Sequence, residues 1–282
     1  MSEIMSATKL HVDSRWKQPS ESHSDFSIRL SQSLHFGEDV VAVVDNITIP
    51  NTFYSVNAGN DSLYIAEVLA ATGAVRKVTL AHGNLSGVTY AAALANALNT
   101  ASPAILGSSP YSAIYSLQTG KVLVTGPNTY PFCIMSDDQI QAHDNASPGG
   151  LVIDKNNPRS GNGILRNRSN GNSSPSTVDY TYAPNFTSQF LDLMPIHNIF
   201  IHSNLSNLTV MTPRGTSDCI ACCPISSSFG QTVHHNATTM ADSVEVSRRS
   251  FETLTFQLRD SYGNEVETNG SSWSCSVLFI QK

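Results

Sequence analysis

Residues 250–281 read SFETLTFQLRDSYGNEVETNGSSWSCSVLFIQ, and this stretch decides the fold class. Two segments of alternating apolar and polar side chains flank a polar connection that contains Asn264 and Asn269-Gly270. Alternation with a period of two places one set of side chains on a core face and the other set outward. Because the connection is rich in turn formers, the stretch predicts an antiparallel pair of strands that closes a β-sheet. The apolar positions are Leu254, Phe256, Leu258, Trp273, Cys275, Val277 and Phe279.

A second strand pattern lies near the N-terminus. Residues 26–30 alternate between apolar and polar side chains, and residues 40–44 are continuously apolar. If the two ends of the chain pair in one sheet, everything between them belongs to one domain. We therefore expect a single domain over residues 26–282, preceded by an extended polar arm over residues 1–25 that buries little apolar surface.

Short strand patterns continue through the middle of the chain at a spacing of roughly 8–12 residues. One helical window interrupts them at residues 88–101, where Thr89 is a candidate N-cap. Residues 144–185 are rich in Asn, Gly, Ser and Pro, and we expect a long surface loop there. Short strands with a single helix predict a β-sandwich, jelly roll or barrel.

Composition excludes several classes of function. Charged residues make up 13% of the 282 residues, against roughly 25% in an average soluble domain. The net charge is −6, so a basic footprint for nucleic acid is absent, and direct nucleic-acid binding is not expected. No apolar run approaches the about 20 residues of a transmembrane helix. The arginine pairs Arg166/Arg168 and Arg248/Arg249 are interpreted as solvated surface.

The cysteines and the N-terminus both indicate a reducing compartment. The chain has five cysteines, an odd number with three of them clustered, which does not suit a disulfide framework. The first fifteen residues lack the apolar core of a signal peptide. The N-x-S/T sequons are therefore interpreted as chance products of an Asn-rich composition. Examples begin at Asn46, Asn84, Asn204 and Asn207.

The motif Cys219-x-x-Cys222-Cys223 is the first candidate for metal chemistry. Zinc takes four tetrahedral ligands, usually with a second pair at a set distance, and no second C-x-x-C occurs. His234-His235 could complete the set only by folding back. The segment is better interpreted as an apolar strand with buried thiols.

The remaining candidates are weaker. Neighbouring side chains of a strand point to opposite faces, so His234-His235 suits a loop better than a shared metal. Asp137-Asp138 is interpreted as a solvated turn, since paired carboxylates act when they converge across a cleft. No nucleophile elbow, P-loop or dinucleotide fingerprint is present. We assign no catalytic, cofactor-binding or metal-binding residues, and we expect the protein not to be an enzyme.

Several stretches, in order along the chain, carry a resemblance to a known family. They are residues 10–15, 25–30, 43–56 with the ending IPNTFYSV, 83–99, 225–230, 254–264 and 269–279. In this order they resemble the jelly-roll minor capsid and penton-like proteins of large tailless icosahedral double-stranded DNA viruses, including virophages and polinton-like elements. The loop at residues 144–185 departs from that pattern, which leaves its role open.

The resemblance implies an all-β jelly-roll sandwich of antiparallel strands with one short helix and long loop insertions. It also implies a structural protein of an icosahedral capsid, at a penton or a minor, cementing position. Such a protein acts by symmetric self-assembly, and its partners are the major capsid protein and other minor capsid proteins. We expect a homo-oligomer, a pentamer if it is a penton, located in the virion and assembled in the host cytoplasm or nucleus. The arm at residues 1–25 would thread between neighbouring capsomers.

Two alternatives stay open. One is a carbohydrate- or receptor-binding β-sandwich of a virion, with the loop at residues 144–185 as the binding element and Tyr180 and Tyr182 as stacking residues. Those tyrosines would equally suit a role in pinning the loop to the body. The other alternative is a metal-binding jelly-roll enzyme, for which the necessary spacing of histidines and carboxylates is missing.

Overall fold

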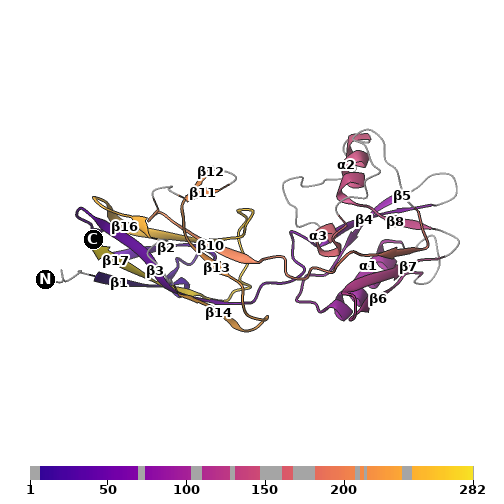
Figure 1. Cartoon of the computed structure of the whole chain (residues 1–282), viewed down its shortest axis with the longest axis horizontal. Helices are drawn as coiled ribbons and strands as arrows, with labels where there is room; N and C mark the ends of the chain where they lie inside the picture. Colours follow the sequence, from indigo (N-terminus) through magenta and orange to yellow (C-terminus); the bar gives the residue numbers. More distant parts are fainter. Residues whose placement is uncertain are drawn as a thin grey trace. The chain divides into compact units, whose positions relative to one another are not determined.

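The computed structural model folds into two compact units, whose elements are labelled in Figure 1. Unit 1 consists of Met1–Phe53 and Ile196–Lys282, and unit 2 consists of Tyr54–Pro195. The structure describes residues 7–68, 74–102, 110–127, 131–146, 161–167, 182–206, 210–212, 215–236 and 243–281.

Unit 1 is a sandwich of two antiparallel sheets. The first sheet has the order β1-β17-β3-β14, with β15 also paired to β3. Its strands are β1 (Ala7–Asp13), β17 (Ser274–Gln281), β3 (Val40–Pro50), β14 (Thr232–Asn236) and β15 (Val244–Glu245). The second sheet has the order β13-β10-β16-β2. Its strands are β13 (Cys219–Pro224), β10 (Asn198–Ser203), β16 (Ser250–Arg259) and β2 (Asp25–His35).

The apolar faces of the two sheets share one core. Phe256 of β16 is fully buried, and its ring lies 5.9 Å from that of Phe26 on β2. Phe26 in turn meets the ring of Trp273 edge-on at 5.7 Å, just before β17. Val277 and Phe279 of β17 belong to the same buried cluster. A five-stranded sheet faces a four-stranded one, and the chain crosses between the sheets, which is the arrangement of a jelly roll.

The predicted pairing within residues 250–281 is wrong, although both strands exist. β17 pairs with β1 and β3, whereas β16 pairs with β10 and β2 in the opposite sheet. Alternation identifies the face that a strand buries, and both strands bury theirs in the same core. The two ends of the chain do pair, as predicted, through β1 with β17 and β2 with β16.

The N-terminal segment differs from the expected arm. β1 pairs with β17 at seven positions, from Ala7↔Ile280 to Asp13↔Ser274, and a short 3-10 helix η1 (Ser14–Trp16) follows it. The reason is local: Val12 is 1% exposed and belongs to the core of unit 1. The brief alternation around this residue is therefore a strand signal.

Unit 2 lies in the chain between β3 and β10 and has its own buried core. This division differs from the single domain expected over residues 26–282. Its two sheets have the orders β5-β4-β8 and β6-β7-β9. The strands are β4 (Ser62–Glu67), β5 (Ala74–Thr79), β6 (Ser112–Ser116), β7 (Lys121–Thr125), β8 (Phe132–Ile134) and β9 (Asn185–Thr187). Strand patterns look alike on both sides of its boundaries, so the sequence does not mark them.

Three helices occur among the described residues, where the sequence predicted one. The predicted helix is α1 (Gly87–Ala101), which buries Tyr90, Leu94 and Leu98. Its N-cap is Ser86, which forms a capping box with the expected cap Thr89. The other helices are α2 (Asp137–Ala146) and α3 (Gly161–Leu165).

The β11–β12 hairpin and the segment at residues 144–185 both border residues that the structure does not describe. Unit 1 also carries a hairpin of β11 (Val210–Thr212) and β12 (Gly215–Ser217). The loop predicted at residues 144–185 lies largely outside the described residues, and α3 occupies part of its described portion. No helix in the described ranges is long and apolar enough to cross a bilayer.

Candidate functional site

Four connections meet at one end of the jelly roll. Two of them are joined to the segment that follows β3: the backbone N–H of Asn51 donates to the carbonyl of Gln231 at 2.7 Å, and the hydroxyl of Thr52 donates to the carbonyl of Thr268 at 2.6 Å. The β13–β14 and β16–β17 connections are therefore held against the point where the chain leaves unit 1.

The β1–β2 connection is fixed to the same end through Trp273. Its indole N–H donates to the carbonyl of His23 at 2.6 Å, and its backbone N–H donates to the hydroxyl of Ser14 at 2.9 Å. Ser14 is fully buried and its hydroxyl lies 2.9 Å from Nδ1 of His23. These bonds place residues 17–24 opposite residues 265–270, although the two segments are far apart in the sequence.

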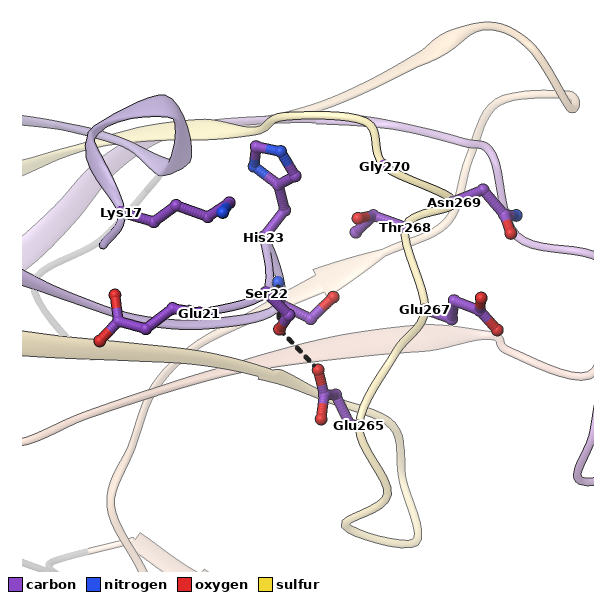
Figure 2. Close-up of a pocket in the computed structure, with 10 residues that line it drawn as sticks. Lys17, Glu21, Ser22, His23, Glu265, Glu267, Thr268, Asn269 and Gly270 are labelled. Atoms are coloured by element: carbon purple, nitrogen blue, oxygen red, sulfur yellow. Dashed lines mark hydrogen bonds between the residues drawn. The ribbon is translucent and has the colours of Figure 1, made fainter. Parts of the chain in front are cut away.

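The two segments line an open hollow of about 620 Å³, here called the polar hollow. Figure 2 shows ten residues that line it, all from unit 1. Those that matter for its chemistry are Lys17, Ser22, His23, Glu265, Glu267 and Thr268.

A tight turn shapes the wall of the polar hollow that carries Thr268. Asn269 and Gly270 have positive φ angles of 50° and 77°, and the N–H of Ser271 donates to the carbonyl of Thr268 at 3.0 Å. Two successive positive φ angles define a type I′ turn, which Asn-Gly adopts at little cost. The Asn269-Gly270 turn predicted from the sequence therefore forms, and it positions one side of the hollow.

Glu21 lines the polar hollow, but its carboxylate is already engaged. It accepts hydrogen bonds from the N–H of Gln18 and from both the N–H and the hydroxyl of Ser27. Desolvation acts to raise the pKa of Glu21, but these hydrogen bonds, together with the charge of Lys17, hold it below its usual value. In Figure 2 the carboxylate lies away from Ser22 and Thr268. Glu21 therefore shapes the loop more than it offers an open acceptor.

Ser22 and Glu265 join the two walls directly. The hydroxyl of Ser22 donates to Oε1 of Glu265 at 2.8 Å, the dashed line in Figure 2. The same hydroxyl oxygen accepts the N–H groups of Ser24 and Asp25. Because Ser22 is held by these three bonds, the exposed carboxylate of Glu265 is fixed at the edge of the hollow.

Lys17 and Thr268 face each other across the polar hollow. In Figure 2 the lysine side chain points inward from one wall and the threonine from the other. The ammonium group of Lys17 makes one long contact, 3.5 Å to the carbonyl of Gln18, and forms no ion pair with a described residue. Thr268 is 4% exposed, and its hydroxyl has no hydrogen-bond partner among the described residues.

The structure separates the predicted cysteine and histidine candidates. Cys219 and Cys223 are buried on β13, while Cys222 is exposed on the same strand. Burial, helped by the charge of Cys222, raises the pKa of Cys223 to about 11. His234 and His235 belong to β14 in the other sheet, in a strand and not in the expected loop. In the described ranges, no group of three or more His, Cys, Asp or Glu side chains surrounds a metal position.

The other predicted positions have structural roles. Asp137 and Asp138 form the first turn of α2, where carboxylates favour the positive end of the helix dipole, and not the expected solvated turn. Tyr182 packs beside the buried Tyr64 and Met135, while Tyr180 lies outside the described residues. The polar hollow itself was not predicted. Its only sequence signal was the Asn269-Gly270 turn.

The fold defines the class: an antiparallel jelly roll with a second unit inserted between β3 and β10. No family model matches the sequence, and no curated protein matches it. The chain is similar to the crystal structure of selenomethionine-labelled mavirus penton protein, with a TM-score of 0.54. The two share 10% sequence identity over 97% of this chain and 99% of that chain. The likeness therefore extends over both units and confirms the predicted jelly-roll fold.

Proposed function

We propose that this chain is a structural protein of an icosahedral viral capsid, at a penton or another minor position. The observation that carries the proposal is the likeness in fold to a mavirus penton protein over nearly the whole of both chains. A shared jelly roll alone would be weak support, because the fold serves many functions. The inserted unit between β3 and β10 makes the support stronger, since the likeness includes it.

Assembly would proceed through surfaces of the jelly roll. Its outer strands are β1 and β14 in one sheet and β13 and β2 in the other. Outer strands present backbone N–H and C=O groups that can pair with another chain. β13 has no charged side chain in its sequence CIACCP, so it lacks the charges that usually block such pairing. We infer that β13 is the edge most suited to contact a neighbouring subunit.

The proposed partners are the major capsid protein, other minor capsid proteins and further copies of this chain. Closed symmetry would repeat one modest contact around a ring, and a penton would form a pentamer. The proposed location is the virion, after assembly in the host cytoplasm or nucleus. The proposed role is non-enzymatic and involves no direct contact with nucleic acid, in keeping with the net charge of −6.

The first experiment is the oligomeric mass of the purified chain by mass photometry. A pentamer would support the vertex position, and a monomer would support a cementing role in which contacts form only against the major capsid protein. Mass spectrometry of purified virions then tests the class of function. If the chain is absent from virions that contain the other capsid proteins, the capsid proposal is overturned.

A further inference from the structure

We propose that the polar hollow of unit 1 is a binding site for a neutral, hydroxyl-rich ligand, namely a sugar residue of a glycan. This goes beyond the capsid role and does not depend on it. The proposal rests on the side chains that face the hollow, on the Thr268 hydroxyl, which makes no hydrogen bond with a described residue, and on the volume of about 620 Å³. Pockets for small ligands span roughly 300–1,000 Å³, so the volume suits one or a few sugar rings.

The charges around the hollow favour a neutral ligand. Lys17 offers an ammonium group without an ion-pair partner among the described residues, and Glu265 offers a carboxylate with Oε2 left open to a donor. An anion would meet the carboxylate of Glu265, while a cation would meet the ammonium group of Lys17. A sugar hydroxyl can accept from an ammonium group and donate to a carboxylate, so a polyol satisfies both charges at once.

Thr268 supplies the second, independent observation. The residue as a whole is 4% exposed, its hydroxyl makes no hydrogen bond with a described residue, and its side chain faces the hollow in Figure 2. Among the described residues, the buried side-chain oxygens without a partner are those of Tyr90 and Ser227, so the Thr268 hydroxyl is open to the hollow and not sealed in the core. Its backbone carbonyl, by contrast, already accepts from Thr52 and Ser271. The hydroxyl is therefore available for recognition, while the backbone holds it in place.

The walls of the hollow are also preorganised. Ser22 is fixed by two backbone N–H donors and by its bond to Glu265. His23 is fixed through its carbonyl, which accepts from the indole of Trp273. Rigid donors and acceptors lose little entropy on binding, which favours recognition of a small polar ligand.

Saturation-transfer NMR of the full chain with neutral monosaccharides tests the proposal directly. The probes are glucose, galactose, mannose and N-acetylglucosamine, with sialic acid and an acidic peptide as charged comparisons. We expect contact signals from at least one neutral sugar. Glycans released from host cells and from purified virions, printed on one array, then identify the source of the ligand.

Two variants remove the recognising groups without removing backbone contacts: Thr268→Val and Lys17→Met. Each lost hydrogen bond is expected to weaken sugar binding about threefold to tenfold. The matched controls Thr125→Val and Lys77→Met change exposed residues of unit 2 and are expected to leave binding unchanged. Thermal unfolding of all four variants checks that each remains folded.

Three outcomes would overturn the proposal. The first is the absence of contact signals with every neutral sugar. The second is sugar binding that survives both Thr268→Val and Lys17→Met in folded protein. The third is binding of sialic acid or the acidic peptide alone, which would identify the hollow as a docking site for a charged partner. None of these outcomes affects the capsid proposal, which is tested by oligomeric mass and virion composition.

Discussion

The hydroxyl of Tyr111 donates a 2.5 Å hydrogen bond to Oε1 of Glu67, a carboxylate that is 1% exposed inside unit 2. Ser102 donates to the same oxygen at 2.6 Å, and Arg76 donates to Oε2 at 3.0 Å. One carboxylate thus joins β4, β5, the end of α1 and the residue before β6. Burial and the bond to Glu67 both raise the pKa of the Tyr111 phenol, so the group stays a donor at neutral pH.

Tyr111→Phe is expected to destabilise unit 2 by about 1.5–3 kcal/mol, because it removes a hydrogen bond to a buried charge. Hydrogen exchange of the α1 amides measures the effect. Both tryptophans of the chain, Trp16 and Trp273, belong to unit 1, so their fluorescence reports the other unit. We expect faster exchange in α1 with an unchanged fluorescence midpoint.

Tyr115→Phe is the matched control, since Tyr115 is a partly buried tyrosine of β6 that packs against the same core but does not bond to Glu67. It is expected to change exchange in α1 by less than about 0.5 kcal/mol. Equal effects of Tyr111→Phe and Tyr115→Phe would contradict the role given to the bond with Glu67.

Acid is expected to lower the free energy of unfolding of unit 1 because it protonates the carboxylate of Asp13. Hydrogen bonds from the Arg15 side chain hold the pKa of Asp13 below its ordinary value of 3.8, although burial opposes them. A carboxyl with a lowered pKa in the folded state stabilises the fold above its unfolded pKa, and this contribution is lost as the pH falls through the folded pKa. Stability should therefore decline as the pH drops below about 3.8.

Asp13→Asn is expected to remove this part of the acid dependence. Urea unfolding of unit 1 is followed by tryptophan fluorescence at neutral pH and at a pH well below 3.8. The variant should be less stable than the wild type at neutral pH, with a smaller difference in acid. Glu252→Gln changes an exposed carboxylate of β16 and is the control. A parallel decline of the wild type and Asp13→Asn would argue against this account.

Thiol labelling is expected to single out Cys222. It is exposed, whereas the other four cysteines are buried. Burial raises the pKa of Cys275 to about 12, so that thiol stays protonated and unreactive at neutral pH. Native protein should therefore react rapidly with about one equivalent of a thiol reagent, and Cys222→Ser should abolish that phase. Rapid labelling that persists in Cys222→Ser would show that a buried thiol opens readily.

The sequence predicted the positions of the strands better than it predicted which strands pair with each other. The alternation around Phe256 and Val277 indicates which side chains are buried, and both are. It contains no information on which strand lies beside which, because any two strands with apolar faces can share a sheet or face each other across a core. Helix α1 was predicted because Tyr90, Leu94 and Leu98 repeat with helical spacing, and nothing competes with that pattern.

The polar hollow could not be predicted because the residues that line it come from distant parts of the sequence. Lys17 and Thr268 lie far apart in the sequence and line the same hollow because β1 pairs with β17, with Val12 opposite Cys275, and because Trp273 bonds to Ser14 and His23. No sequence motif marks the hollow. Its polar groups come from separate segments, and only the folded structure shows which of them remain open to a ligand. The insertion of unit 2 was equally hidden, because composition does not change where β3 ends.

Removal of residues 1–13 separates folding from assembly. β1 pairs with β17 along its whole length and buries Val12, so this deletion exposes the edge of β17 and should lower the fluorescence midpoint of unit 1. Loss of capsid assembly on this deletion would then report a damaged jelly roll, and not a lost arm. Removal of residues 1–6 keeps β1 and is expected to keep the midpoint. Only an assembly defect in this shorter deletion supports a threading arm, and an unchanged midpoint in the longer one would show that β1 contributes little to the sandwich.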